Sequence, residues 1–552
     1  MKLPALLITV LALLAPPLFA LAPVPAPASP VNQVFQFHHD GVCILWGDGQ
    51  PSKASSYLWI PENTRRVRGL LILCTNVPEH MLVGHSAIRQ VCAANDLAIV
   101  WSTPSFMNFK RTEPGQKKMS DEHETSAAFL QQQLDALAEK SGYAEIATVP
   151  WLPIGESGHL LMVDALVETN PERCIAGVWL KNNHLPPKNR TVPALVVYGS
   201  AQEWGQDKSD IRSQWNNIGK AYDGILTQRA KNPDWPLSYV LDGQSGHFDC
   251  SERLTAYLAR YIDLAAKARL SADGAPALKP LNLATGFYAD LPVPGHENKP
   301  VAPATTKAAL PWYFDQSQAN EAQAFAAINW QAETQLPVYL DESGAEIPHT
   351  FNGITNLKPA VFEEDGLTFT VRGRLADQIP AEFAAAGEKL AKTDGPMAIE
   401  WLCGPIEPLG GGRFRIALDR VWQGGGATYV ALRQPGNATV RGIVQPAGVD
   451  LKAIRPNVGK AQKITFPAPA DVKAGTKSVA LAATSDAGLA VRYFVRSGPA
   501  VIQDGQVVFT ALPPRAKFPV EVTVVAWQWG RTGADPVKMA PLVEQTFRLT
   551  AP

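Results

Sequence analysis

The chain has 552 residues and lacks the features that mark several large protein classes. It has no excess of charge of either sign, because 50 Lys and Arg balance 51 Asp and Glu. Proteins that bind nucleic acid need a basic surface, and no basic run is present, so we expect no nucleic-acid partner. After the first residues, no apolar run approaches the roughly 20 residues of a membrane helix, so we expect no membrane span.

Cysteine is also scarce, with six residues in the whole chain. They are Cys43, Cys74, Cys92, Cys174, Cys250 and Cys403. Six thiols in a chain of this length do not make a disulfide scaffold, although an oxidising compartment would permit bridges, whose pairing the sequence leaves open. The sequence has no CxxC, no HExxH and no other clustered His and Cys spacing, so we expect no metal site and no cofactor.

The first 22 residues have the pattern of a cleaved export signal. Lys2 gives a positive start, residues 6–14 are a short apolar stretch, and Ala20-Leu21-Ala22 places small residues where signal peptidase reads them. The apolar stretch is shorter than a comfortable membrane helix, although an uncleaved anchor is the alternative. We therefore expect a secreted or periplasmic protein.

Residues 31–270 are expected to form an α/β domain. Six short apolar runs read as buried strands, at 69–74, 97–101, 148–154, 174–180, 194–198 and 237–241. Helix-like stretches follow at 85–95, 121–141, 158–169, 209–229 and 251–268. Strands that alternate with helices in this way predict a mostly parallel sheet with helices on both faces.

The pattern changes after residue 270. Residues 271–345 are rich in proline and then in alanine, and we interpret them as a linker that packs on the first domain. From residue 346 onwards, short alternating runs stand between Gly- and Pro-rich turns, which is typical of antiparallel β-sandwiches. We expect one β-sandwich domain at 346–460 and a second at 461–552, of which residues 485–531 resemble bacterial immunoglobulin-like modules.

The strongest candidate for chemistry is the sequence PIGESGHLLMVDALV at residues 153–167. An apolar run ends at Ile154, a short turn follows, and a helical pattern begins directly afterwards. A strand, a tight turn and a helix in this order present a serine on strained backbone, as in a nucleophile elbow. Ser157 is thus the candidate nucleophile, and the backbone N–H of Gly158 is placed to face an oxyanion. The alternative is a serine in an ordinary loop.

The turn resembles the GxSxG elbow of the α/β-hydrolase superfamily, with His159 in place of the last glycine. We interpret His159 as a packing or capping residue. The resemblance implies a triad in the chain order Ser, acid, His. His247 precedes an amphipathic helix in the last loop of the domain and is the candidate general base; the alternative is a surface histidine. A serine hydroxyl needs such an imidazole to take its proton, and the imidazole needs a carboxylate to fix its tautomer.

The resemblance places the triad acid in the loop after the strand at 194–198. Glu203 fits this position best, and Asp207 and Asp210 are the alternatives. Trp204, in the same loop, is a candidate for stacking on the substrate, and so is Trp101 at another strand end, although packing in the core or at the rim is the more frequent role of such residues.

The oxyanion hole needs a second N–H donor besides Gly158. In the resembled family it comes from the loop after an early strand, here the loop after 69–74. Asn76 or Val77 would supply it.

These features predict a secreted serine hydrolase that cleaves carboxylic esters through an acyl-enzyme on Ser157. By analogy with enzymes that carry β-sandwich appendages, acyl groups on polysaccharides are the favoured substrate, and the appendages are interpreted as spacers. One alternative is a peptidase or dienelactone-type hydrolase on the same triad. The other is a catalytically inactive hydrolase-like protein that serves adhesion or carbohydrate binding. The oligomeric state is left open.

Overall fold

The computed structural model describes residues 34–44, 51–106, 119–181, 189–200, 218–243, 245–272, 274–350, 353–422 and 427–552. An eight-stranded sheet forms the first part, in the order β1-β2-β4-β3-β5-β6-β7-β8. Its strands are β1 (Phe37–Ile44), β2 (Pro51–Trp59), β3 (Gly69–Cys74), β4 (Leu97–Thr103), β5 (Trp151–Glu156), β6 (Gly177–Leu180), β7 (Ala194–Gly199) and β8 (Leu237–Asp242).

The strands β3 to β8 are parallel to their neighbours within this set, and β1 and β2 add an antiparallel edge. The six predicted strands correspond to β3 to β8, and every residue of these six is buried. Burial along the whole strand is what a parallel sheet between two helical layers requires. The expectation of a mostly parallel sheet is therefore confirmed.

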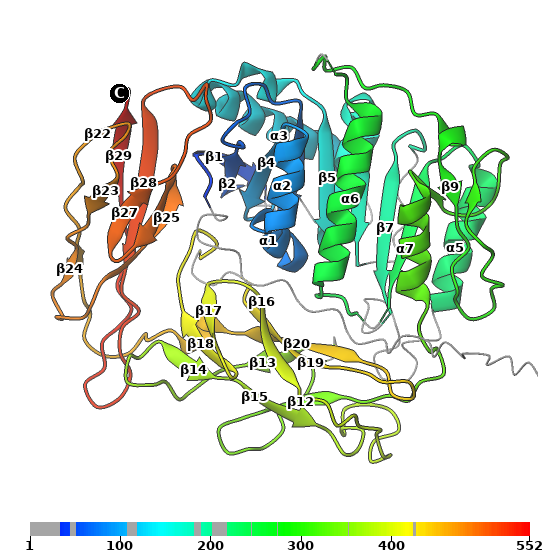
Figure 1. Cartoon of the computed structure of the whole chain (residues 1–552). Helices are drawn as coiled ribbons and strands as arrows, with labels where there is room; N and C mark the ends of the chain where they lie inside the picture. The colour runs from blue at the N-terminus through cyan, green and yellow to red at the C-terminus, as the bar shows by residue number, and fades with distance from the viewer. Residues whose placement is uncertain are drawn as a thin grey trace, which may run out of the picture.

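Helices cover both faces of the sheet (Figure 1). They are α1 (Val77–Val83), α2 (Ser86–Ala94), α3 (Met119–Ser141), α4 (Leu160–Thr169), α5 (Ile218–Lys231) and α6 (Glu252–Arg269). On one face α3 packs against α4, and on the other α2 packs against α6. Residues 209–217, the start of one predicted helix, lie outside the described residues. Within the described part of the chain, no helix is both long and apolar enough to cross a membrane.

The segment expected to be a linker contains ordered elements. These are β9 (Phe287–Tyr288), β10 (Ala302–Pro303), β11 (Trp312–Tyr313), α7 (Gln316–Ala326) and β12 (Pro337–Leu340). The hydroxyl of Tyr313 donates to the carbonyl of Tyr239 in β8 at 2.7 Å, and α7 packs on β8 and α6. Most of the segment thus extends the α/β part, whereas β12 pairs with a strand of the region that follows.

Small, mainly antiparallel sheets make up the rest of the chain, consistent with β-sandwiches. We call residues 337–454 the middle β region. It holds β12, β13 (Thr355–Leu357), β14 (Thr368–Thr370), β15 (Arg372–Leu375), β16 (Ala398–Cys403), β17 (Ile406–Gly410), β18 (Arg413–Ile416), β19 (Tyr429–Gln434), β20 (Ile443–Val449) and α8 (Leu451–Ile454). Its largest sheet has the order β13-β20-β19-β16.

We call residues 464–550 the C-terminal β region. It holds β21 (Ile464–Thr465), β22 (Val472–Lys473), β23 (Ser478–Ala480), β24 (Thr484–Ser485), β25 (Arg492–Ser497), β26 (Ala500–Gln503), β27 (Gln506–Phe509), β28 (Val520–Trp527) and β29 (Val543–Thr550). The sheets β22-β29-β28-β25 and β23-β27-β26 contribute to one apolar core, which includes Val522, Val524 and Phe547.

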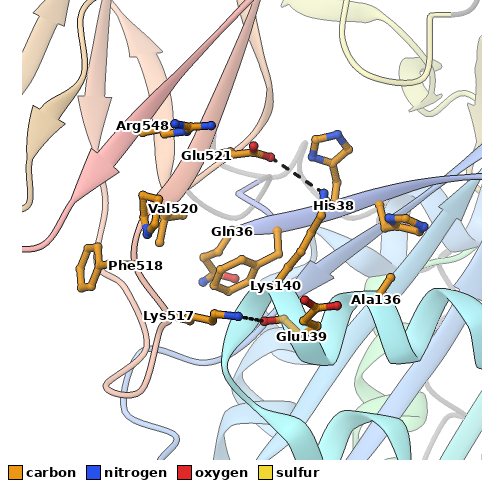
Figure 2. Close-up of a pocket in the computed structure, with 13 residues that line it drawn as sticks. Gln36, His38, Ala136, Glu139, Lys140, Lys517, Phe518, Val520, Glu521 and Arg548 are labelled. Carbon is orange, nitrogen blue, oxygen red and sulfur yellow. Dashed lines mark hydrogen bonds and ion pairs between the residues drawn. The ribbon is translucent and has the colours of Figure 1, made fainter.

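The C-terminal β region lies beside the antiparallel edge of the large sheet (Figure 1). A pocket of about 360 Å³ lies at this junction. Figure 2 shows His38 and Lys140 on one side of it and Glu521 on the other. The Ser497 hydroxyl of β25 lies 2.6 Å from His38 Nδ1, within hydrogen-bonding distance. The histidine therefore joins the two parts of the chain.

This contact predicts that acid weakens the folded protein. Burial, together with the charge of Arg496, lowers the pKa of His38 to about 4, from 6.5 in an unperturbed chain. Between pH 6.5 and 4 the unfolded chain therefore binds more protons at this position than the folded chain, and stability falls as the pH falls through this window. We expect the Tm, followed by circular dichroism, to decrease less steeply over this window in His38→Asn than in the wild type. Identical slopes would contradict the assignment.

Candidate active site

The backbone at Ser157 has the strained conformation that a nucleophile elbow needs. The strand β5 ends at Glu156, and Ser157 follows with φ of 52°, in the left-handed region that non-glycine residues rarely occupy. A short 3-10 turn, Ser157–His159, then leads into α4. Strain of this kind is found where a functional side chain must be held in one place.

The strand and the helix approach each other closely on either side of this serine. A Cβ atom on Gly155 would lie 2.3 Å from the carbonyl oxygen of His159, so only glycine fits at this position. The ring of His159 is buried, and its Nδ1 lies 3.3 Å from Oε1 of Glu79 in α1. The same oxygen accepts the backbone N–H of Glu156 at 2.8 Å. His159 therefore braces the turn against α1.

The two loops predicted to carry the nucleophile and the base meet in the structure. Nε2 of His247 lies 2.8 Å from Oγ of Ser157, although the two residues are 90 positions apart. His247 stands in the loop between β8 and α6, and its ring is 3% exposed. A distance of 2.8 Å is within the reach over which an imidazole can take a hydroxyl proton.

A carboxyl group that was not predicted as part of the site also reaches this pair. Glu156 is fully buried, and its Oε1 lies 3.3 Å from Nε2 of His247. This is the same ring nitrogen that faces Ser157, whereas the acid that orients a catalytic histidine contacts the other nitrogen, Nδ1. Glu156 therefore does not occupy the position of a triad acid. The signal was its place in the sequence, a charge at the end of a buried strand directly before the serine.

The predicted acid Glu203, its alternatives Asp207 and Asp210, and Trp204 all lie outside the described residues. The strand before them, β7, ends at Gly199, which pairs with Asp242 at the end of β8. The loop of Glu203 and the loop of His247 thus start from neighbouring positions at the same edge of the sheet.

The predicted oxyanion donors lie where β3 gives way to α1. Asn76 precedes α1, and its side-chain amide donates to the carbonyl oxygen of Glu156 at 3.2 Å and to the carboxylate of the same residue. These bonds hold the start of α1 against the elbow. Val77 is the first residue of the helix, where a backbone N–H has no partner within the helix itself. The side chain of Asn76 is thus occupied, and the backbone N–H groups of Gly158 and of either Asn76 or Val77 remain the candidate donors.

Trp101 is buried, with 2% of its surface exposed, among the rings of Phe35, Tyr57 and His80. Its surroundings are those of a core residue.

The described part of the chain contains neither a disulfide bond nor a cluster of metal ligands. The thiols of Cys74, Cys92, Cys174, Cys250 and Cys403 are buried and form no disulfide bond with one another. No group of three or more His, Cys, Asp or Glu in the described part of the chain could hold a metal ion.

The strand order, the elbow between β5 and α4 and the Ser157–His247 contact together define an α/β-hydrolase arrangement in the N-terminal part of the chain. No family model and no curated protein matches the sequence.

Several solved structures are similar to this part of the chain. An α/β serine hydrolase without a lid from Xanthomonas campestris has 14% identity, with 42% of this chain and 96% of that one covered and a TM-score of 0.25. An esterase from Pyrobaculum calidifontis has 11% identity, 42% and 87% coverage and a TM-score of 0.25. LpqC, a poly(3-hydroxybutyrate) depolymerase from Bordetella parapertussis, has 12% identity, 44% and 96% coverage and a TM-score of 0.28.

Proposed function

We propose that the chain is a serine hydrolase that cleaves carboxylic esters. The observation that carries the proposal is the 2.8 Å contact between His247 Nε2 and Ser157 Oγ at a strained elbow. As Oγ attacks the acyl carbon, the imidazole takes its proton, and the backbone N–H groups of Gly158 and of Asn76 or Val77 stabilise the oxyanion. The intermediate then expels the alcohol, which receives the proton from the imidazolium. Water then attacks the acyl carbon of the acyl-enzyme while the imidazole takes its proton. The acid is released, and the proton returns to Ser157.

The direct test is covalent labelling of the purified protein by a fluorophosphonate, followed by mass spectrometry of the modified peptide. Modification of Ser157 supports the proposal, because only an activated serine reacts rapidly with such a reagent. Failure of the folded protein to react would favour the inactive, adhesion-type alternative.

Glu203 is proposed as the triad acid, and paired variants separate it from Glu156. In Glu203→Gln the imidazole loses the group that fixes its tautomer, so we expect kcat to fall about 10³- to 10⁴-fold. In Glu156→Gln the Nδ1 side of the ring is unchanged, so we expect a loss of about 100-fold or less. Initial rates on p-nitrophenyl acetate at a saturating concentration measure both. The reverse order of effects would move the acid role to Glu156, and an unchanged rate in Glu203→Gln would direct attention to Asp207 and Asp210.

The proposed substrates are acyl esters on extracellular polysaccharides, acted on after export directed by residues 1–22. The export pattern of the N-terminus and the β regions that accompany the α/β part support this. Rates on p-nitrophenyl esters, acetylated and feruloylated sugars and peptide amides rank the candidates, and faster cleavage of amides than of esters would favour a peptidase. Sequencing the N-terminus of the mature protein tests the export signal, for which we expect cleavage after Ala22.

A further inference from the structure

The loop that carries His247 is fixed by buried polar contacts on one side of the histidine. Lys181, directly after β6, donates from Nζ to Asp242 Oδ2 at 2.6 Å and to Ser245 Oγ at 2.8 Å. The hydroxyl of Ser245 in turn donates to Oδ2 of Asp249 at 2.9 Å. Ser245 and Asp249 stand two positions before and two positions after His247, so this bond closes the loop around the histidine.

The other side of the loop is held by the middle β region. Nη2 of Arg433, in β19, donates to Oδ1 of Asp249 at 2.9 Å, and Nε of the same arginine donates to Oε2 of Glu400 in β16 at 2.7 Å. The side chains of Arg433 and Asp249 are 5% and 2% exposed. A guanidinium that bridges two carboxylates in a buried place fixes direction as well as distance, because its donors form a rigid fork.

Apolar packing reinforces the same junction. The ring of Phe248 meets the ring of His247 edge to face, with centroids 4.8 Å apart, and stacks on the ring of Tyr429 in β19 at 5.1 Å. Beside it, Val77 of α1 packs in one buried cluster with Leu402 of β16 and with other residues of this sheet. The middle β region thus lies against α1 and against the loop between β8 and α6, which carries His247 (Figure 1).

We propose that Arg433 is a positioning residue for the Ser157–His247 pair and that the middle β region is part of the catalytic unit rather than a spacer. This inference rests on the proposed function. Arg433 acts through Asp249: it holds the loop at the position two residues beyond His247, and the imidazole keeps its place opposite Ser157. A displacement of about 1 Å at such a pair is enough to lower the rate about 100-fold.

The test uses the full chain with Arg433→Met, which keeps much of the length of the side chain and removes the charge. We expect kcat on p-nitrophenyl acetate to fall about 10- to 100-fold with little change in KM, and the rate of fluorophosphonate labelling to fall by a similar factor. Arg433→Lys keeps the charge but not the forked arrangement of donors, so we expect its kcat to lie between those of the wild type and Arg433→Met. The matched control is Arg413→Met in β18, whose guanidinium binds the exposed Glu363 and which should retain the kcat of the wild type.

A role in stability alone makes a different prediction. It would lower the Tm of Arg433→Met and leave the kcat of the folded protein at 20 °C unchanged, and that result overturns the inference. If Arg433→Met does not fold, Asp249→Asn decides: it keeps the shape of the loop but weakens the ion pair, and a kcat within twofold of the wild type overturns the inference. A wild-type protein that neither hydrolyses esters nor reacts with fluorophosphonate would instead overturn the proposed function.

Discussion

Replacing Ser157 by alanine is expected to lower kcat/KM for ester hydrolysis by at least about 10⁴-fold. The reason is that alanine removes the hydroxyl oxygen that receives the acyl group and that His247 Nε2 activates from a distance of 2.8 Å. Initial rates on p-nitrophenyl acetate, corrected for spontaneous hydrolysis, measure the loss, and mass spectrometry should find no fluorophosphonate adduct. Ser271→Ala, far along the chain from the elbow, is the control and should match the wild type.

The same position allows a second, independent measurement. Because Ser157 has φ of 52°, glycine relieves strain there, and Ser157→Gly is expected to be inactive yet more stable than the wild type by about 1 kcal/mol. This corresponds to a rise in Tm of about 1 °C in a protein of this size. A variant that loses activity and also loses stability would indicate that the elbow is not strained. An alanine variant that keeps 1% of the activity or more would contradict the role of the serine as nucleophile.

The parallel part of the sheet could be predicted from the sequence because its strands are buried along their whole length. Runs such as GLLILC at 69–74 have no polar residue, and the structure places them as β3 to β8. The antiparallel edge was missed, because β1 (FHHDGVCI) and β2 (PSKASSYLW) contain polar residues in no clear alternation. The helix α1 was missed as well, since it is only seven residues long and contains a proline in its first turn.

The pairing of Ser157 with His247 was predicted because a motif and a chain order pointed to it. Neither a motif nor a chain order pointed to Glu156 or to Arg433. The carboxylate of Glu156 turns toward Nε2 of His247 only because of how the elbow bends, and Arg433 meets Asp249 only because two regions 184 positions apart pack together. The sequence of β19 predicts a strand, all of whose residues except Tyr429 are buried, but it does not show against which part of the chain they pack.

Replacing His247 by glutamine is the second large effect that we expect, with kcat lowered about 10³- to 10⁴-fold. Glutamine fills much of the same space but cannot take the hydroxyl proton at neutral pH. The rate of labelling by fluorophosphonate should fall with kcat, since that reaction also requires an activated serine. The effects of substitutions on kcat are not additive for residues that act as one unit. The double variant Ser157→Ala, His247→Gln should therefore be no slower than Ser157→Ala alone.

Glu156 is the alternative general base that this experiment tests. Its carboxylate lies 3.3 Å from His247 Nε2, so it is the described carboxylate placed to act as a base beside Ser157 if the histidine is only a structural neighbour. In that case His247→Gln would keep most of the activity, and adding Glu156→Gln would remove it. If the imidazole is the base, His247→Gln alone removes the activity, and adding Glu156→Gln changes the residual rate little. Comparison of His247→Gln with the double variant His247→Gln, Glu156→Gln therefore distinguishes a site in which the imidazole moves the proton from one in which the carboxylate does.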